Sequence, residues 1–150
     1  MEMAIFIGIQ ASGKSTFYKQ QFYNTHIRLN LDMLRTRHRE NLLMLACLGA
    51  KQAFVIDNTN PTPQEREPYI TLAKSHNFQI SGYYFRSSVD ESLQRNKKRH
   101  PREQVPDVAI YATHKKLILP DYAEGFDKLY YVRMGKIGDF SVKEWGTDEI

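Results

Sequence analysis

The sequence predicts a single α/β domain built on a mostly parallel central sheet of about five strands. Three observations lead to this prediction. Short β-branched and aromatic runs alternate with longer amphipathic runs, which is the pattern of βαβ units. A glycine-rich segment, GIQASGKST, stands between the first apolar run and a helical pattern. The chain has 150 residues, 41% hydrophobic and 25% charged, which suits one hydrophobic core and no second domain over residues 1–150.

The expected elements alternate along the chain. Apolar runs rich in β-branched and aromatic residues predict five strands, over residues 3–7, 26–31, 53–56, 78–85 and 128–133. Amphipathic runs between them predict five helices, over residues 14–23, 33–48, 64–76, 89–98 and 107–118. We predict an irregular tail over about 135–150, because no periodicity is readable there.

Cap residues support two of these helix starts. Thr62 is expected to cap the third helix, with Pro63 in the first turn and Glu65 completing a capping box. Ser88 and Glu91 repeat that box at the start of the fourth helix. Both helices should therefore begin sharply.

The composition argues against a membrane-spanning or secreted protein. The longest apolar stretch, residues 42–50, is about half of the roughly 20 residues that cross a bilayer. The N-terminal segment enters the fold too soon to be a signal peptide. The single cysteine, Cys47, cannot form an internal disulfide and is expected to be a small core residue. We therefore expect a cytoplasmic protein with no membrane partner.

Positive charge is concentrated in the body of the chain. The formal net charge is +4, but residues 139–150 carry −3, which leaves +7 for the first 138 residues. Two basic clusters stand out, RTRHR at 35–39 and RNKKRHPR at 95–102. Such clusters are typical of proteins that handle polyanions, although solvated helix faces carry charge runs as well.

The glycine-rich segment is a phosphate-binding loop. Gly8, Gly13, Lys14 and Ser15 fit G-x-x-x-x-G-K-[ST], in the required context between a strand and a helix. The glycines let backbone N–H groups turn around the phosphates, while Lys14 reaches the β- and γ-phosphates and Ser15 offers its hydroxyl to Mg²⁺. The expected nucleotide-binding residues of the loop are Gly8, Ala11, Ser12, Gly13, Lys14, Ser15 and Thr16.

Asp57 is the expected second metal-side residue. It closes the apolar strand AFVID, and a carboxylate at such a strand end commonly approaches the magnesium shell of phosphate-loop proteins. The alternative is a turn or helix-capping acid. A GTP switch is disfavoured, because a guanine-reading N-K-x-D is missing and the nearest segment, NKKR at 96–99, lacks the acid.

A kinase additionally needs a base for the acceptor hydroxyl and positive charge over the transferred phosphoryl group. Asp32, at the exit of a predicted strand, fits the first need, although a helix N-cap is the alternative. Arg35 lies one helical turn further on and would face the same acceptor. Arg95 and Arg99 share one face of the fourth helix, where they would close over the phosphates as part of a lid at about 88–106.

With these residues assembled, the chain resembles the kinase domain of the polynucleotide kinase family, from about residue 3 to residue 133. The motifs that carry the resemblance are GIQASGKST, LDMLR as the family's D-x-x-R, DNTNP at 57–61, and RNKKR followed by VPDV. The resemblance implies a P-loop kinase three-layer fold with a helical lid, and transfer of the γ-phosphate of ATP, with Mg²⁺, to 5′-hydroxyl ends of DNA or RNA. The roles it implies are catalysis by Asp32, Lys14 and Arg99, ATP binding by Arg95 and Arg99, metal binding by Ser15 and Asp57, and substrate binding by Asp32, Arg35, Asn58, Thr59 and Asn60.

Two features depart from the family pattern. Nothing in the sequence resembles the D-x-D-[GS]-[TV] phosphatase signature of the two-domain members, so no 3′-end repair is implied. In part of the family, the position of Asn58 is an acid that partners the D-x-x-R arginine. The partner of Arg35 is therefore open at this point.

Two other functions compete with this one. A P-loop kinase of a small molecule, such as a sugar, a nucleoside or an antibiotic hydroxyl, would share the loop, the base and the lid. A nucleic-acid-binding module that uses ATP only as a structural ligand would share the basic clusters. The basic clusters favour a polynucleotide over a small molecule, and a base at Asp32 argues against a pure binder.

Overall fold

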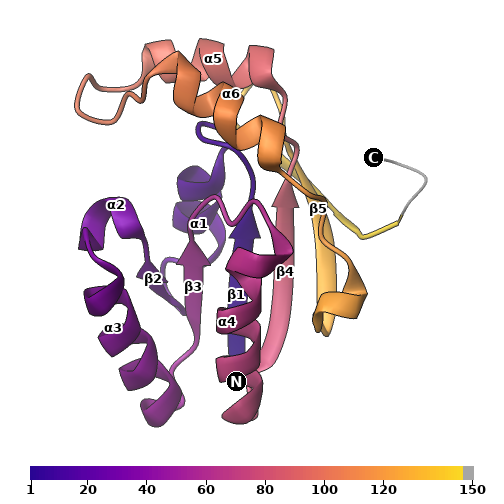
Figure 1. Cartoon of the computed structure of the whole chain (residues 1–150). Helices are drawn as coiled ribbons and strands as arrows, with labels where there is room; N and C mark the ends of the chain where they lie inside the picture. The colour runs from indigo at the N-terminus through magenta and orange to yellow at the C-terminus, as the bar shows by residue number, and fades with distance from the viewer. Residues whose placement is uncertain (147–150) are drawn as a thin grey trace.

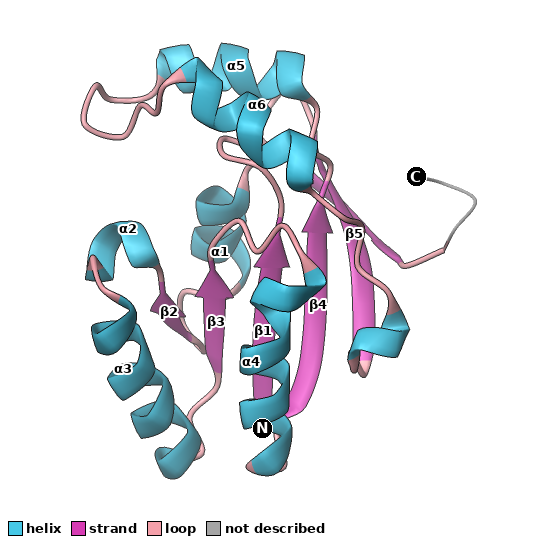
Figure 2. Cartoon of the chain, viewed as in Figure 1, coloured by secondary structure: helices cyan, strands magenta, loops and turns pink. Residues whose placement is uncertain are grey.

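A central sheet lies between two layers of helices, and a pair of helices covers one end of the sheet (Figures 1 and 2). This computed structural model describes residues 1–146. The strands are β1 (Glu2–Ile7), β2 (Ile27–Leu29), β3 (Phe54–Asp57), β4 (Gln79–Phe85), β5 (Lys128–Met134) and β6 (Phe140–Glu144). The helices are α1 (Lys14–Gln21), α2 (Leu31–Leu34), α3 (Arg37–Ala50), α4 (Pro63–Ser75), α5 (Val89–Lys98) and α6 (Asp107–Lys116), with a 3₁₀ turn η1 (Tyr122–Glu124).

The sheet has the order β2-β3-β1-β4-β5-β6, and all pairs except β5–β6 are parallel. β1 is central, with Ile5 opposite Ile56 of β3 and Gly82 of β4. Because successive side chains of a strand point to opposite faces, β1 serves two cores. Met3, Ile5 and Ile7 pack on the α3 and α4 side, whereas Ala4 and Phe6 pack on the α1 side. The predicted α/β class and parallel sheet are confirmed.

The predicted helix over 33–48 is wrong as one element, because the chain forms α2 and α3 with a break at Arg35. Asn30 leaves the strand and caps α2 by accepting a hydrogen bond from Met33 N, so β2 ends at Leu29 and is shorter than predicted. Arg35 then adopts a positive φ of 76°, which ends α2. Thr36 starts α3 by accepting a hydrogen bond from the backbone N–H of Arg39.

The predicted irregular tail contains a sixth strand. A turn at Gly135–Gly138, with Gly138 at a φ of 83°, reverses the chain, and β6 pairs antiparallel with β5. The ring of Phe140 lies 5.1 Å from that of Phe17 in α1, centroid to centroid. Packing of the partly buried Phe140 against α1 therefore supports a strand whose other side chains are exposed. The rest of the predicted tail, residues 147–150, lies outside the described residues.

Both expected N-caps form, but within residues 1–146 neither Glu65 nor Glu91 makes the return bond that would complete the predicted capping boxes. Thr62 accepts a hydrogen bond from Glu65 N, and Ser88 accepts one from Glu91 N. α5 and α6 lie across the carboxyl ends of the strands, joined by a loop that projects to one side (Figure 2). Asn96 of α5 fixes that loop through two hydrogen bonds with the backbone of Val105. We use "lid" below for residues 88–106.

A fully buried arginine anchors the segment after β3. Arg66 of α4 donates hydrogen bonds to the carbonyls of Asn60 (2.9 Å), Pro61 (3.0 Å) and Ile118, and forms an ion pair with Glu124 at 2.9 Å. Ile118 N in turn donates to Pro61 O at 2.8 Å. Each guanidinium donor group has a partner, which is what burial of this charge requires. Arg66 thus ties residues 57–61 to the chain that follows α6.

Cys47 is buried and free, as expected for a core residue. Between residues 1 and 146, no helix combines the length and the apolar composition that a bilayer crossing needs.

The packing of β4 against β5 generates a stability prediction. A Cβ at Gly82 would lie 2.6 Å from the Leu129 side chain and 2.7 Å from the Phe126 ring, both buried. We expect Gly82→Ala to lower the free energy of unfolding by about 1–3 kcal/mol through overpacking, measured by urea denaturation. Gly49→Ala is the matched control, because Gly49 is exposed in α3 and its Cβ would meet nothing within 4 Å. The control should be neutral or stabilising by up to about 1 kcal/mol; equal losses in both variants would refute this account.

Candidate active site

A cavity of about 250 Å³ lies at the carboxyl ends of β1, β2 and β3, and Arg99 and Val105 of the lid line it from the other side. In doubly wound sheets this end of the strands forms the ligand crevice. The cavity is lined by Gln10, Ala11, Lys14, Ser15, Asn30, Leu31, Asp32, Asp57, Asn58, Thr59, Arg99 and Val105. It therefore brings the phosphate-binding loop, the D-x-x-R segment and the lid to one place.

The backbone of the phosphate-binding loop is held in a fixed shape. Gly13 has a φ of 103°, a conformation that favours glycine, and directly precedes α1. Gly8 leaves no room for a side chain, because a Cβ there would lie 3.0 Å from Phe85. The N–H of Gly8 donates to Thr59 O at 3.0 Å, and that of Ile9 donates to the Ser87 hydroxyl at 3.1 Å. Both neighbouring strands thus brace the loop.

The Lys14 side chain folds back onto the phosphate-binding loop. Its ammonium donates to the carbonyl oxygens of Gly8 (3.0 Å) and Ile9 (2.8 Å). Burial of the ammonium lowers the pKa of Lys14 to about 8, and the nearby Asp57 carboxylate opposes this shift. An anion at the loop would favour the protonated lysine.

Ser15, Asp57 and Arg28 form a compact polar cluster. The Ser15 hydroxyl donates to Asp57 Oδ2 at 3.2 Å. Arg28 of β2 donates from Nε to the same Oδ2 at 2.7 Å and from Nη2 to Ser15 Oγ at 2.9 Å. The Asp57 side chain is 1% exposed, and its ion pair with Arg28 compensates the negative charge that is buried there. Ser15 and Asp57 together offer hard oxygen atoms of the kind that Mg²⁺ prefers.

Asp32 is exposed in the first turn of α2, at the rim of the cavity. Two hydrogen bonds fix this turn to the end of β3. Asn30 Nδ2 donates to the Asp57 carbonyl at 2.6 Å, and Leu31 N donates to Asn58 Oδ1 at 3.0 Å. The carboxylate is thus presented to the cavity by a backbone anchored on the neighbouring strand.

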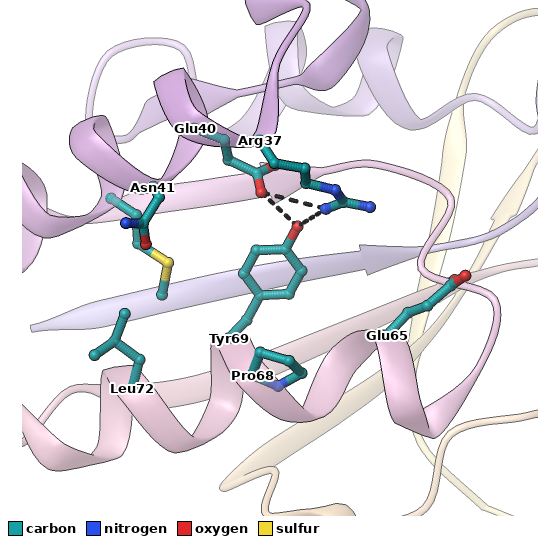
Figure 3. Close-up of a pocket in the computed structure, with 8 residues that line it drawn as sticks. Arg37, Glu40, Asn41, Glu65, Pro68, Tyr69 and Leu72 are labelled. Atoms are coloured by element: carbon teal, nitrogen blue, oxygen red, sulfur yellow. Dashed lines mark hydrogen bonds and ion pairs between the residues drawn. The ribbon is translucent and has the colours of Figure 1, made fainter.

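A second network continues from Asn58 to a cavity of about 360 Å³ between α3 and α4, shown in Figure 3. Asn58 Nδ2 donates to Glu40 Oε2 at 2.9 Å, and the other oxygen of Glu40 accepts from the Tyr69 hydroxyl at 2.6 Å and from Arg37 at 3.3 Å. Burial and the bond to Glu40 raise the pKa of Tyr69, so the phenol remains a donor at neutral pH. The acid that supports Asn58 therefore stands at position 40, and its arginine is Arg37.

The lid contributes arginines from above. Arg95 donates to the carbonyl of Ala11 in the phosphate-binding loop at 3.2 Å and pairs with Glu91 at 3.4 Å. Arg99 lines the cavity, and its positive charge contributes to the lowered pKa of Lys14. Positive charge from the lid therefore meets the loop.

Not every expected site residue lines the cavity. Asn60 is 4% exposed and donates to Phe6 O at 2.8 Å, so its side chain braces β1. The Arg35 side chain is exposed and makes no hydrogen bond or ion pair within residues 1–146, although its backbone N–H donates to Leu31 O at 2.7 Å. The Ser12 hydroxyl is buried with no hydrogen-bond partner in the same range. The predicted residues that do line it are Ala11, Lys14, Ser15, Asp32, Asp57, Asn58, Thr59 and Arg99.

Sequence reasoning missed Arg28, Glu40, Tyr69 and Gln10. Gln10 Nε2 donates to the Thr113 hydroxyl of α6 at 2.9 Å and so links the loop to the helices above it. The signal that pointed to Arg28 was a charged residue in the middle of the predicted strand over 26–31. Within residues 1–146, no group of three or more His, Cys, Asp or Glu side chains is arranged to hold a metal ion. A metal here would need phosphate oxygens as further ligands.

Two polynucleotide phosphatase/kinases are similar to this chain in sequence. The chain is 28% identical over 143 residues to the bifunctional polynucleotide phosphatase/kinase of Schizosaccharomyces pombe, covering 93% of this chain and 35% of that protein. It is 33% identical over 135 residues to a putative bifunctional polynucleotide phosphatase/kinase of Acanthamoeba polyphaga mimivirus, covering 85% and 32%. The chain thus spans about a third of the length of these relatives. They confirm the resemblance that the motifs predicted.

Solved structures confirm the P-loop kinase fold. Chaetomium thermophilum Kti12 in complex with ADP-AlF3 superposes with a TM-score of 0.66 at 14% identity, over 98% of this chain and 91% of that one. A gluconokinase from Sinorhizobium meliloti superposes with a TM-score of 0.58 at 12% identity, over 88% and 82%. A family model described as an AAA domain matches residues 3–118, which is more than half of the sequence. The chain therefore belongs to this AAA domain family.

Proposed function

We propose that this protein is an ATP-dependent polynucleotide 5′-hydroxyl kinase. The observation that carries the proposal is the cavity in which Lys14, Asp32 and Arg99 meet, because it combines a phosphate-binding loop, a candidate base and a lid cation. The similarity to two polynucleotide phosphatase/kinases supports the choice of acceptor.

In the proposed reaction, the acceptor 5′-oxygen attacks the γ-phosphorus of ATP, and the bond from that phosphorus to the β–γ bridging oxygen breaks. Asp32 accepts the proton of the hydroxyl as the new P–O bond forms, and ADP leaves. Lys14 and Arg99 neutralise charge on the phosphoryl oxygens in the transition state. Asp32 is exposed at the cavity rim, so an incoming hydroxyl can reach it.

Ser15 and Asp57 would hold Mg²⁺. Their side-chain oxygens lie 3.2 Å apart beside the loop, which fits a cation that takes few protein ligands and completes its shell with phosphate oxygens and water. When bound, Mg²⁺ would supply neutralisation of the β- and γ-phosphate charge.

The acceptor is proposed to be a polynucleotide because arginines follow Asp32 closely in the chain. The Arg35 side chain is exposed and unpaired within residues 1–146, and the side chain of Arg37, although paired with Glu40, is 68% exposed. Both belong to the basic cluster at 35–39, next to the α2 turn that carries Asp32. Arginines placed there would bind the phosphate that follows the acceptor nucleoside.

The decisive experiment is transfer of labelled γ-phosphate to a panel of acceptors: 5′-hydroxyl DNA and RNA oligonucleotides, nucleoside 3′-phosphates, bare nucleosides and sugars. Labelling of oligonucleotides and nucleoside 3′-phosphates supports the proposal. Equal labelling of bare nucleosides or sugars would instead indicate a small-molecule kinase. ATP binding without transfer to any acceptor would indicate a binding module.

The role of Asp32 generates the first activity prediction. Asp32→Asn should lower turnover by roughly 10² to 10⁴, the usual effect of losing a positioned base, while the affinity for ATP stays within about twofold. Steady-state kinetics and equilibrium ATP binding test the two parts separately. Asp90→Asn, an exposed acid in the first turn of α5, is the control and should leave turnover unchanged. A parallel loss of ATP affinity in Asp32→Asn would make Asp32 a structural or metal-side residue.

Salt dependence tests the acceptor class. The affinity for a 5′-hydroxyl oligonucleotide should fall with rising salt. Each neutralised phosphate of a single strand contributes about −0.7 to the log–log slope, so contact with roughly two phosphates gives a slope of roughly −1 to −2. Arg35→Ala should flatten this slope and reduce the advantage of a nucleoside 3′-phosphate over the bare nucleoside. Lys74→Ala, in the last turn of α4, serves as the charge-matched control. A slope of zero for the unaltered protein would contradict a polynucleotide acceptor.

The lowered pKa of Lys14 predicts how nucleotide binding depends on pH. Since phosphates favour the ammonium, ATP binding must raise this pKa above its value of about 8 in the free protein. ATP affinity should therefore be highest below pH 8 and fall by up to about tenfold per pH unit above it. Titration calorimetry between pH 7 and 10 measures the affinity and the protons taken up. Lys14→Met should bind ATP more weakly and without this pH dependence; an unchanged pH profile in that variant would assign the effect elsewhere.

A further inference from the structure

Arg28 contacts both proposed magnesium ligands, and the proposed function gives it no role. Its guanidinium reaches Asp57 Oδ2 at 2.7 Å and Ser15 Oγ at 2.9 Å, from the middle of the edge strand β2. The side chain of Arg28 is 25% exposed, whereas that of Asp57 is 1% exposed. A side-chain cation thus contacts both oxygens that would face the metal.

The contacts limit what Ser15 can offer to a metal ion. A hydroxyl has one hydrogen to donate and two lone pairs. The Ser15 hydrogen points to Asp57, and one lone pair accepts from Arg28 Nη2. A divalent cation at this oxygen would also lie within a few ångströms of the guanidinium, and two like charges so close repel strongly. The metal and the guanidinium therefore compete for the same oxygen.

We propose that Arg28 is a resident cation of the metal subsite, and that a divalent metal binds by displacing its guanidinium from Ser15 Oγ. Arg28 keeps the buried Asp57 charge compensated, and it lowers the affinity for the metal at the same time. The inference rests on the proposed nucleotide and metal site, but not on the identity of the phosphate acceptor.

A place for the displaced guanidinium exists beside the site. The Arg28 Cζ atom already lies 6.0 Å from the centre of the Tyr18 ring, within the range of cation–π attraction. That ring is fixed, because its hydroxyl donates to His26 O at 2.6 Å. Arg28 can therefore leave Ser15 while its charge stays near the ring and near Asp57.

The test compares Arg28→Met with the unaltered protein in the presence of ADP and without any acceptor. Free Mn²⁺ is counted by electron paramagnetic resonance, and ADP affinity is measured as a function of Mg²⁺ concentration. Loss of the competing charge should tighten Mn²⁺ binding by roughly 3- to 10-fold. Arg86→Met is the control, since Arg86 pairs with Glu91 at 3.4 Å in a partly exposed ion pair outside the cavity.

The same variant should show an opposite effect on stability. Without metal, Arg28→Met leaves Asp57 buried and unpaired, so the thermal midpoint should fall by several degrees. Saturating Mn²⁺ with ADP should close this gap, because the metal replaces the missing charge. Weaker or unchanged Mn²⁺ binding in Arg28→Met would overturn the proposal and make Arg28 an orienting residue for Asp57.

A second measurement needs no variant of the site to fold. In the ¹H–¹⁵N spectrum of the unaltered protein with ADP, the side-chain Nε–H signal of Arg28 should shift when Mg²⁺ is added. A signal that stays in place while Mg²⁺ tightens ADP binding would overturn the exchange. Failure of Mg²⁺ or Mn²⁺ to bind with ADP would remove the proposed metal site and the exchange together, whereas lack of transfer to oligonucleotides would leave both intact.

Discussion

The buried carboxylate of Asp57 is the point on which the arrangement of this end of the molecule depends. Its Oδ2 accepts hydrogen bonds from Ser15 at the start of α1 and from Arg28 in β2, while its carbonyl accepts from Asn30 before α2. Three segments distant in sequence are thereby held at one strand end. Since an unpaired buried charge is strongly unfavourable, any motion of these segments must provide Asp57 with another partner.

Local signals in the sequence were sufficient for the presence of strands β1 to β5, the phosphate-binding loop and the caps at Thr62 and Ser88. They were insufficient where a distant contact decides the conformation. The left-handed backbone of Arg35 separates α2 from α3, and an arginine carries no local signal for that geometry. Strand β6 forms because Phe140 packs on α1. The contacts of Arg28 with Asp57 and of Asn58 with Glu40 join different elements and follow no sequence spacing.

The side of the cavity that carries Asp32 is built in two layers of contacts. Asn58 contacts the backbone of α2 with one end of its amide and Glu40 with the other, and Tyr69 supports Glu40 from α4. Arg66 fixes the following residues from below. The turn that carries Asp32 thus rests on Asn58, and Asn58 in turn rests on side chains of α3 and α4. Of these side chains, Asn58 is the one that lines the cavity.

The hairpin of β5 and β6 has a consequence for defining the smallest working unit. Beside the backbone of Gly13, the Met134 sulfur and the Phe140 ring lie only 3.1 Å from where a side chain would begin. The family model ends at residue 118, before either strand. A shortened protein designed to that limit would strip the wall from one side of the loop and expose Phe17 to solvent. Engineering of a minimal version should therefore retain the chain through residue 144.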